Sequence, residues 1–170
     1  VSQANATDFH IAGFRGAGVK VAVMDIGFKG LSAAQSAGDI PFNVITRDFT
    51  GRGLQTQYKH GTACAEIVHD MAPDAELHLL KISDEEDLYQ ALDYCKANGI
   101  HIISVSIGTY GSGPGNGTGP IHDACDEARA HGMLVVAAAG NSANTYSTDG
   151  NPIPIGTHWE GQFVDSNNDN

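Results

Sequence analysis

Short apolar runs alternate with helical patterns along most of the chain. Each run is rich in Val, Ile, Leu and Ala and is continuous in apolar character, which is typical of parallel strands buried on both faces. The second run is more polar than the others, so we expect it to lie nearer an edge of the sheet. The five predicted strands are 19–24, 42–49, 76–82, 100–107 and 133–139.

Three segments between these strands carry apolar residues at the i, i+3, i+4, i+7 spacing of a helix face. The first begins at His60, the second follows an acidic capping box at 83–86 and ends at Asn98-Gly99, and the third begins at Pro120. We expect the apolar stripes of these helices to be buried. They are Cys64, Ile67, Val68 and Met71; then Leu88, Ala91, Leu92 and Cys95; and last Ile121, Ala124, Cys125 and Ala128.

This alternation predicts an α/β fold, a three-layer α/β/α arrangement with a mainly parallel sheet covered by helices on both faces. In such sheets the chemistry gathers outside the carboxyl ends of the strands. Asp25 follows the first strand, 106–108 end the fourth, Asn141 follows the fifth, and His60 begins a helix on the same rim. We therefore expect these polar groups to converge at one edge.

A length of 170 residues fits one domain. We place its folded part at 1–143 and an irregular acidic and polar tail at 144–170. The spacing of oxygen ligands in 165–170 is similar to the start of a calcium loop, but the glycine and the closing glutamate are absent. We interpret the tail as a solvated loop; a structural calcium ion is compatible with it, but no motif supports one.

The chain is acidic, with 9 Lys and Arg against 20 Asp and Glu and a net charge of −11. This argues against nucleic acid and anionic membrane surfaces as partners, since both need a positive footprint. No run of 18 apolar residues exists, so no membrane span is predicted.

The eight histidines form no H-E-x-x-H element and the three cysteines form no spaced pair, so no metal site is predicted. We expect the cysteine thiols to be buried. A disulfide between Cys95 and Cys125 is compatible with their placement on neighbouring helices, but no pattern supports it.

Asp25, His60 and Asn141 make chemical sense as a set. A carboxylate can hold an imidazole in one tautomer and stabilise its charged form, and a side-chain amide can donate a hydrogen bond to an oxyanion forming on an acyl carbon. A histidine at the start of a packed helix can then act as a general base, provided that a nucleophile lies within reach.

Four segments in register carry a family resemblance. They are Val-Ala-Val-Met-Asp-Ile-Gly at 21–27, His-Gly-Thr-Ala-Cys-Ala at 60–65, Ile-Ser-Val-Ser-Ile-Gly at 103–108 and Val-Val-Ala-Ala-Ala-Gly-Asn at 135–141. In order and rough spacing they resemble the motifs of subtilisin-like serine proteases. The resemblance implies that Asp25 is the orienting carboxylate, His60 the general base and Asn141 the amide of the oxyanion hole.

The resemblance also implies how a polypeptide substrate is bound. A backbone strip would pair with the extended peptide, and a wall of small residues would line the primary specificity pocket. The strip is Ser106, Ile107 and Gly108, and the wall is Ala138, Ala139 and Gly140. The family's chemistry requires no cofactor, and its members suggest a secreted or extracytoplasmic location.

Two departures from the family pattern matter. The residue after the aspartate is Ile26 where Ser or Thr is usual, which removes a local hydroxyl donor. The family's nucleophile lies in a Gly-Thr-Ser-x-x-Ala helix start, and nothing like it follows Asn141. We therefore expect the amino-terminal part of a longer protease, incomplete at the carboxyl side and inactive alone, whose uncovered apolar surface favours self-association or binding of the missing part.

Two other interpretations stay open. A non-catalytic subtilisin-like module, retained for binding, would share these motifs. A nucleotide-binding α/β domain is suggested by Gly27 and Gly30 after the first strand, but Asp25 stands where the first glycine of a dinucleotide fingerprint would be, and its charge would repel a pyrophosphate.

Overall fold

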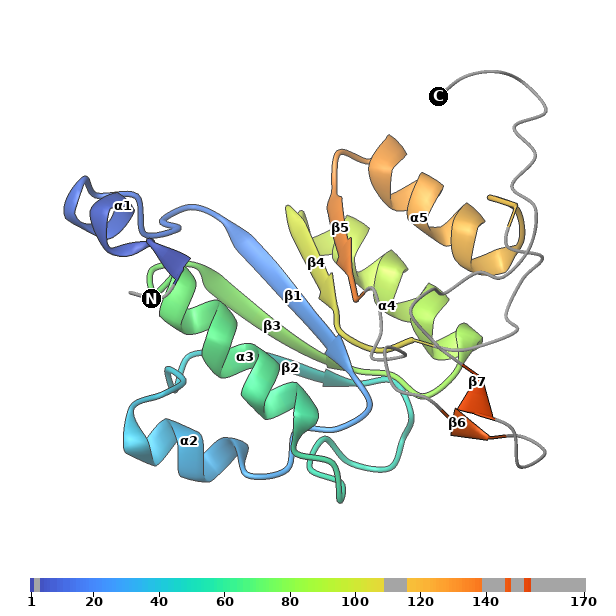
Figure 1. Cartoon of the computed structure of the whole chain (residues 1–170), viewed down its shortest axis with the longest axis horizontal. Helices are drawn as coiled ribbons and strands as arrows, with labels where there is room; N and C mark the ends of the chain where they lie inside the picture. The colour runs from blue at the N-terminus through green and yellow to red at the C-terminus, as the bar shows by residue number, and fades with distance from the viewer. Residues whose placement is uncertain (2–3, 109–115, 139–145, 148–151, 154–170) are drawn as a thin grey trace. The chain divides into compact units, whose positions relative to one another are not determined.

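The computed structural model describes residues 1, 4–108, 116–138, 146–147 and 152–153 (Figure 1). The chain divides into two units, Val1–Ala138 and Ala139–Asn170. The elements of the first unit are α1 Thr7–Ile11, β1 Lys20–Asp25, α2 Leu31–Ala37, β2 Ile45–Asp48, α3 His60–Met71, β3 Glu76–Lys81, α4 Glu85–Asn98, β4 Ile102–Val105, α5 Pro120–Ala130 and β5 Leu134–Ala137.

The second unit contains one described feature, an antiparallel pair of two-residue strands, β6 Tyr146–Ser147 and β7 Pro152–Ile153. The sequence pattern predicted no strand in this region, because such short strands carry no measurable periodicity. The division of the chain at 143 stays a prediction. Across the described residues, no helix combines the length and apolar character that crossing a bilayer requires.

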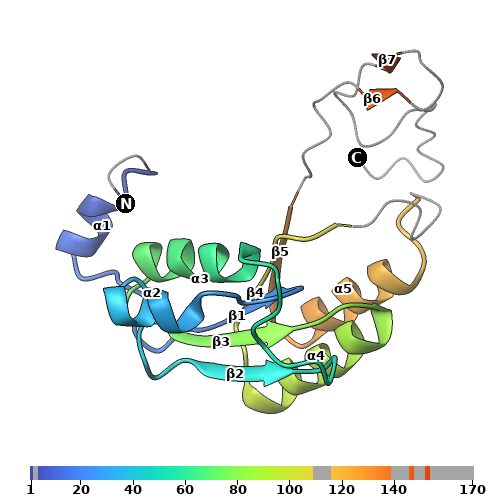
Figure 2. The same cartoon turned by 90° about the horizontal axis from the view of Figure 1, so that it is seen from below.

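The first unit is built on a five-stranded sheet in the order β2-β3-β1-β4-β5, and every neighbouring pair is parallel. Figure 2 shows α2 and α3 on one side of the sheet and α4 and α5 on the other. The predicted three-layer α/β/α class is confirmed. The more polar second strand lies at an edge, as expected, although it is shorter than predicted.

Side chains of β1 alternate between the two faces, as the pleat requires. Ala22 and Met24 pack with α4 and α5, and on the opposite face Val23 packs with α2 and α3. The same alternation puts Asp25 on the α3 face, at the end of the strand. A charged group is thereby placed beneath the first turn of a helix.

Helix α3 lies along β1, with its later turns over the middle of the strand and its first residue over the strand's end. Val68 packs against Val21, and Ala65 packs in the cluster that contains Val23. The buried residues of α3 are Gly61, Thr62 and Ala65. Because two of these are among the smallest residues, the helix can approach the sheet closely.

The predicted buried stripe of α3 is therefore partly wrong. Ile67 is 63% exposed and Met71 is 38% exposed, whereas Cys64 and Val68 are half-buried. The periodicity was real, but small residues, which hydrophobic spacing does not register, face the sheet. In α5 the predicted stripe is confirmed at Ala124 and Ala128, which are buried, and wrong at Ile121 and Cys125, which are exposed.

Other local differences have simple causes. The N-cap of α4 is Asp84, whose side chain accepts the Asp87 N–H at 3.0 Å, while the Asp87 carboxylate accepts the Ser83 N–H at 2.9 Å. The reciprocal cap thus starts one residue later than predicted. Helices α1 and α2 were not predicted, because five and seven residues are too few to show a period. All three cysteines are free, so no Cys95 to Cys125 bridge forms.

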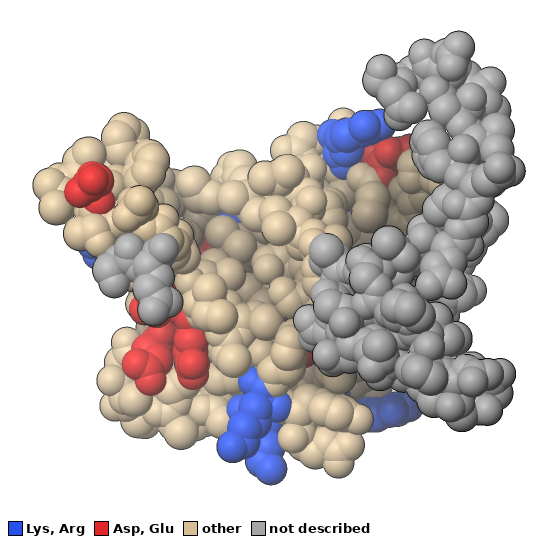
Figure 3. Space-filling view, viewed as in Figure 1, with Lys and Arg blue, Asp and Glu red and all other residues tan. Residues whose placement is uncertain are grey.

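On the α3 side of the sheet, part of the surface of the described residues is apolar and exposed. Leu134 and Val136 of β5 are 58% and 50% exposed, and Ile67 and Met71 of α3 are exposed as well. Figure 3 shows few charged side chains over the middle of this face. This is the uncovered apolar surface that the sequence analysis expected on the sheet and on the His60 helix; what covers it stays a prediction.

The close approach of α3 to β1 makes Gly61 a sensitive position. A Cβ there would lie 2.7 Å from Asp25 Cβ, 2.7 Å from the Gly27 carbonyl oxygen and 2.8 Å from Phe28 Cε1. Gly61→Ala should lower the free energy of unfolding by about 1–3 kcal/mol through overpacking, measured by urea denaturation. Gly108→Ala is the matched control, because a Cβ there meets nothing within 4 Å. Equal stability of the two variants would contradict the packing assigned to α3.

Candidate active site

The site begins with Asp25, whose side chain is fully buried at the end of β1. Its Oδ1 accepts the Ile26 N–H at 2.8 Å, and its Oδ2 lies 2.6 Å from His60 Nδ1. Both carboxylate oxygens therefore have partners. The local donor to Asp25 is the backbone N–H of Ile26, which does not depend on the side chain at that position.

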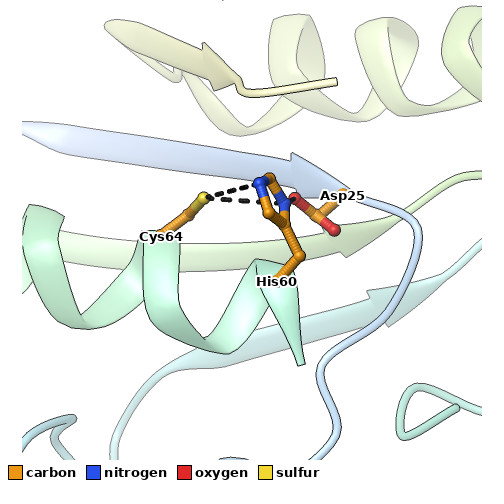
Figure 4. A group of neighbouring side chains, drawn as sticks. All are labelled: Asp25, His60 and Cys64. Atoms are coloured by element: carbon orange, nitrogen blue, oxygen red, sulfur yellow. Dashed lines mark hydrogen bonds and ion pairs between the residues drawn. The ribbon is translucent and has the colours of Figure 1, made fainter. Parts of the chain in front are cut away.

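The ring of His60 projects from the first residue of α3 toward Asp25 (Figure 4). An ionised carboxylate can only accept hydrogen bonds, so Nδ1 must carry the proton that it donates to Asp25. The lone pair of the neutral ring then lies on Nε2. Because the His60 side chain is 52% exposed, a reactant can approach the ring from solvent.

Backbone contacts fix the start of α3 against the segment that follows Asp25. The Gly61 N–H donates to the Gly27 carbonyl at 3.1 Å, and Thr62 Oγ1 donates to the Lys29 carbonyl at 3.1 Å. The Lys29 N–H in turn donates to the Tyr58 carbonyl at 2.9 Å, just before the helix. These hydrogen bonds connect the segment after β1 to the start of α3, and so fix the two elements that carry Asp25 and His60.

A buried lysine that sequence reasoning missed organises the loop leading to α3. Lys81 ends β3 directly beside Asp25 and is 2% exposed. Its Nζ donates to Thr50 Oγ1 at 2.8 Å and to the Gly53 carbonyl at 2.6 Å, and lies 3.5 Å from Asp48 Oδ1. The sequence does show a lysine at the end of an apolar strand. Because lysine is almost never buried without partners, that position could have predicted a buried ion-pair network.

Asp48 is the anionic partner of this network. Its carboxylate accepts the Thr50 N–H at 3.0 Å, the Thr50 hydroxyl at 2.7 Å and the Gly53 N–H at 2.5 Å. Burial alone would raise the pKa of the Asp48 carboxyl, but these hydrogen bonds and the Lys81 ammonium outweigh it and lower that pKa. The network connects the ends of β2 and β3 to the loop between β2 and α3, at the rim of the sheet.

A thiol also faces the ring of His60. Cys64, one helical turn later, has its Sγ 3.8 Å from His60 Nδ1 and 4.0 Å from Nε2. Burial raises the pKa of the Cys64 thiol, a side-chain hydrogen bond with Ser106 opposes the rise, and the charge of Asp25 adds to it. The three side chains Asp25, His60 and Cys64 offer ligand atoms that all lie within 4.8 Å of one another.

The predicted substrate-binding residues fall partly within the described structure. The strip at 106–108 continues β4 past its last paired residue, and the Ala138 N–H donates to the Val105 carbonyl at 3.0 Å. Both segments thus leave the sheet at the same rim as Asp25. Ala139, Gly140 and Asn141 lie outside the described residues, so their placement, and the roles of all these residues, stay predictions.

No serine hydroxyl within the described ranges hydrogen-bonds to His60, whose side-chain partners there are Asp25 and Cys64. Ser106, at the end of the neighbouring strand, is near enough to Cys64 to lower the pKa of its thiol against the rise that burial causes. The structure therefore brings together a carboxylate and an imidazole in the geometry of an oriented base, and no hydroxyl of the described residues hydrogen-bonds to that base.

Comparisons with known proteins relate this chain to one family. The family model described as Subtilase family matches residues 16–158. Subtilisin BL of Lederbergia lenta is 30% identical over 152 residues, which cover 84% of this chain and 55% of that protein. Minor extracellular protease Epr of Bacillus subtilis (strain 168) is 30% identical over 151 residues, covering 78% of this chain and 21% of Epr. The chain thus spans about half the length of subtilisin BL.

A solved structure supports the architecture. The crystal structure of a lanthipeptide protease superposes with a TM-score of 0.63 at 23% sequence identity, covering 81% of this chain and 44% of that one. At this identity the likeness concerns the fold. It agrees with the parallel sheet and its two helical layers.

The Asp48 network predicts a pH-dependent contribution to stability. Because the folded-state pKa is lowered, the carboxylate stabilises the fold above its unfolded pKa of about 4 and loses this effect as the pH falls through the folded value. Asp48→Asn should cost about 2 kcal/mol of unfolding free energy at neutral pH, as expected for hydrogen bonds to a charged group, and progressively less in acid. Urea denaturation across pH, with the exposed Asp39→Asn as control, measures this; a pH-independent loss would contradict the assignment.

Proposed function

Because this chain belongs to the subtilase family, we propose that it supplies the aspartate and histidine of a serine endopeptidase's catalytic triad. The observation that carries the proposal is the 2.6 Å contact between Asp25 Oδ2 and His60 Nδ1 at the rim of the parallel sheet. Such a pair serves to accept and return one proton during acyl transfer.

In this mechanism His60 Nε2 accepts the proton of a serine hydroxyl as its oxygen attacks the scissile carbonyl carbon. The imidazolium is stabilised by Asp25, which stays ionised and holds the ring in the required tautomer. His60 then gives the proton to the leaving amine. The half-exposed ring and fully buried carboxylate suit these roles, because the first must meet the reactants and the second must be shielded from water.

We assign Asn141 to the oxyanion hole, where its amide would donate to the developing negative charge. Residues 106–108 would pair through main-chain groups with an extended polypeptide, a mode that gives affinity with little sequence selectivity. Ala138, Ala139 and Gly140 would form one wall of the specificity pocket. Support for these assignments comes from the family motifs and from the position of 106–108 beyond the end of β4.

The nucleophile, we propose, is not among these 170 residues, so this chain by itself does not hydrolyse peptides. No Gly-Thr-Ser-x-x-Ala segment occurs after Asn141, and within the described residues the hydrogen-bonding neighbours of the His60 ring are a carboxylate and a thiol. The open apolar face around Leu134, Val136 and Ile67 would pack against further protein, either the remaining part of the catalytic domain or a second copy.

The chemistry needs no cofactor, because the proton transfers use side chains alone. We propose an extracytoplasmic location, supported by the relative named an extracellular protease. Membership of the subtilase family leaves no support for the nucleotide-binding interpretation. A non-catalytic binding role is the competing outcome of the experiment below.

The first test uses the 170-residue chain with a chromogenic peptide and a serine-directed phosphonate probe. We expect no turnover and no covalent label, because no described hydroxyl is aligned with His60 Nε2. Labelling of any serine in this chain would overturn the assignment of the nucleophile to other residues.

The second test uses any longer form of the protein that carries the family's serine segment. There His60→Ala should lower kcat/KM at least about 10³-fold by removing the general base, measured with the same peptide. His122→Ala on the surface of α5 is the matched control and should leave kcat/KM unchanged. A folded longer form that is inactive would instead favour a binding module.

A further inference from the structure

One side chain at the site has no part in the proposed proton transfers. Cys64 stands four residues after His60, so the two lie on the same face of α3 in successive turns. Its Sγ is 3.8 Å from His60 Nδ1 and 4.0 Å from Nε2 (Figure 4). Histidine ligands at i and i+4 on one helix face are a common way to hold zinc, and here the second ligand of the pair would be a thiolate.

We propose that Asp25, His60 and Cys64 form a binding site for a zinc-like divalent cation, and that occupation of this site switches the histidine off as a base. The donor set favours this class of ion. Imidazole nitrogen, thiolate sulfur and carboxylate oxygen are the three ligand types of zinc, whereas calcium and magnesium take oxygen ligands almost alone.

The three ligand atoms lie within 4.8 Å of one another, so small movements can bring them to the spacing of a tetrahedral ion. With metal–sulfur and metal–nitrogen bonds of about 2.3 and 2.0 Å, neighbouring ligand atoms stand about 3.5 Å apart. The Sγ to Nδ1 distance of 3.8 Å is close to this value. The contact between Nδ1 and Asp25 Oδ2, 2.6 Å in the structure, must open by less than about 1 Å, which the half-exposed ring can provide.

The surroundings hold the ligands in place. Asp25 is fully buried and its second oxygen is fixed by the Ile26 N–H, and Gly61 seats the first turn of α3 directly against the Asp25 side chain. Three protein ligands leave one coordination position for water, reached through the exposed side of His60.

Metal binding and general-base catalysis are mutually exclusive at this site. A cation on Nδ1 replaces the proton donated to Asp25, and the neutral ring then carries its single proton on Nε2. That nitrogen can no longer accept the hydroxyl proton of a nucleophile. The Cys64 thiol releases its proton to solvent; the ring loses its Nδ1 proton and takes up one from solvent at Nε2, so it stays neutral, and no oxidation or reduction occurs. The inhibitory consequence rests on the proposed function of His60, whereas the metal site does not.

The test of the site titrates the reduced 170-residue chain with Co²⁺, whose thiolate charge-transfer absorption reports sulfur ligation directly. We expect one equivalent to produce this band and Zn²⁺ to abolish it, because zinc binds such sites more tightly than cobalt. Cys64→Ser should remove the band and weaken the apparent affinity at least about 100-fold, since even residues behind the ligands contribute 10–100-fold. Absence of any band in the unmodified chain would overturn the proposal.

Cys125→Ser is the matched control. Cys125 is an exposed thiol on α5, between His122 and Asp126, which form their own contact of 3.1 Å. This variant should keep the band; a band lost in Cys125→Ser and kept in Cys64→Ser would contradict the assignment. Thermal unfolding shows whether each variant is folded and whether it binds the ion. Zn²⁺ should raise the Tm of the unmodified chain and of Cys125→Ser but not that of Cys64→Ser.

The cobalt titration does not depend on a nucleophile. A chain that fails to bind cobalt would contradict the metal site but not the protease proposal, and an inactive longer form would contradict the protease proposal but not the metal site. In an active longer form, Zn²⁺ should lower kcat reversibly, with recovery on chelation, and Cys64→Ser should relieve this inhibition. Equal inhibition of both forms by Zn²⁺ would contradict the switch.

Discussion

The hydrogen bond between a buried carboxylate and a half-exposed imidazole is the interaction on which the site depends. Asp25 can be buried only because both of its oxygens accept hydrogen bonds, one from the Ile26 backbone and one from His60. An unpaired charge in that position would cost several kcal/mol. The His60 ring must therefore lie within hydrogen-bond distance of Asp25, and this requires α3 to pack closely against β1. Gly61 meets that requirement, since any side chain there would collide with Asp25, Gly27 or Phe28.

The same geometry explains why the site lies where it does. In β1 the side chains of Val23 and Asp25 point to the face covered by α3. The same helix therefore packs against the apolar middle of the strand and carries the histidine that contacts the aspartate at its end. Next to it, Lys81 ends β3 and anchors the loop that leads to α3. The rim of the sheet is thus braced on the β3 side of the pair, which helps to hold a proton-transferring dyad in a fixed geometry.

The sequence predicted the sheet, its edge strand and the convergence of Asp25 and His60, because continuous apolar strands and their polar ends leave strong local signals. It failed at the contact face of α3, since hydrophobic spacing favoured Ile67 and Met71 while the sheet is met by Gly61 and Ala65. It also missed the partners of Lys81 and the approach of Cys64 to His60. Both depend on rotamers and on loop paths that no periodicity encodes.

The position of one proton tests this account most directly. In the reduced, metal-free chain, nitrogen-15 NMR of the His60 ring should show the proton on Nδ1 and the lone pair on Nε2, with a far-downfield Nδ1 proton resonance that disappears in Asp25→Asn. This is the tautomer that a carboxylate acceptor at 2.6 Å imposes. A neutral ring protonated on Nε2, or ring spectra that are the same with and without the Asp25 carboxylate, would contradict it.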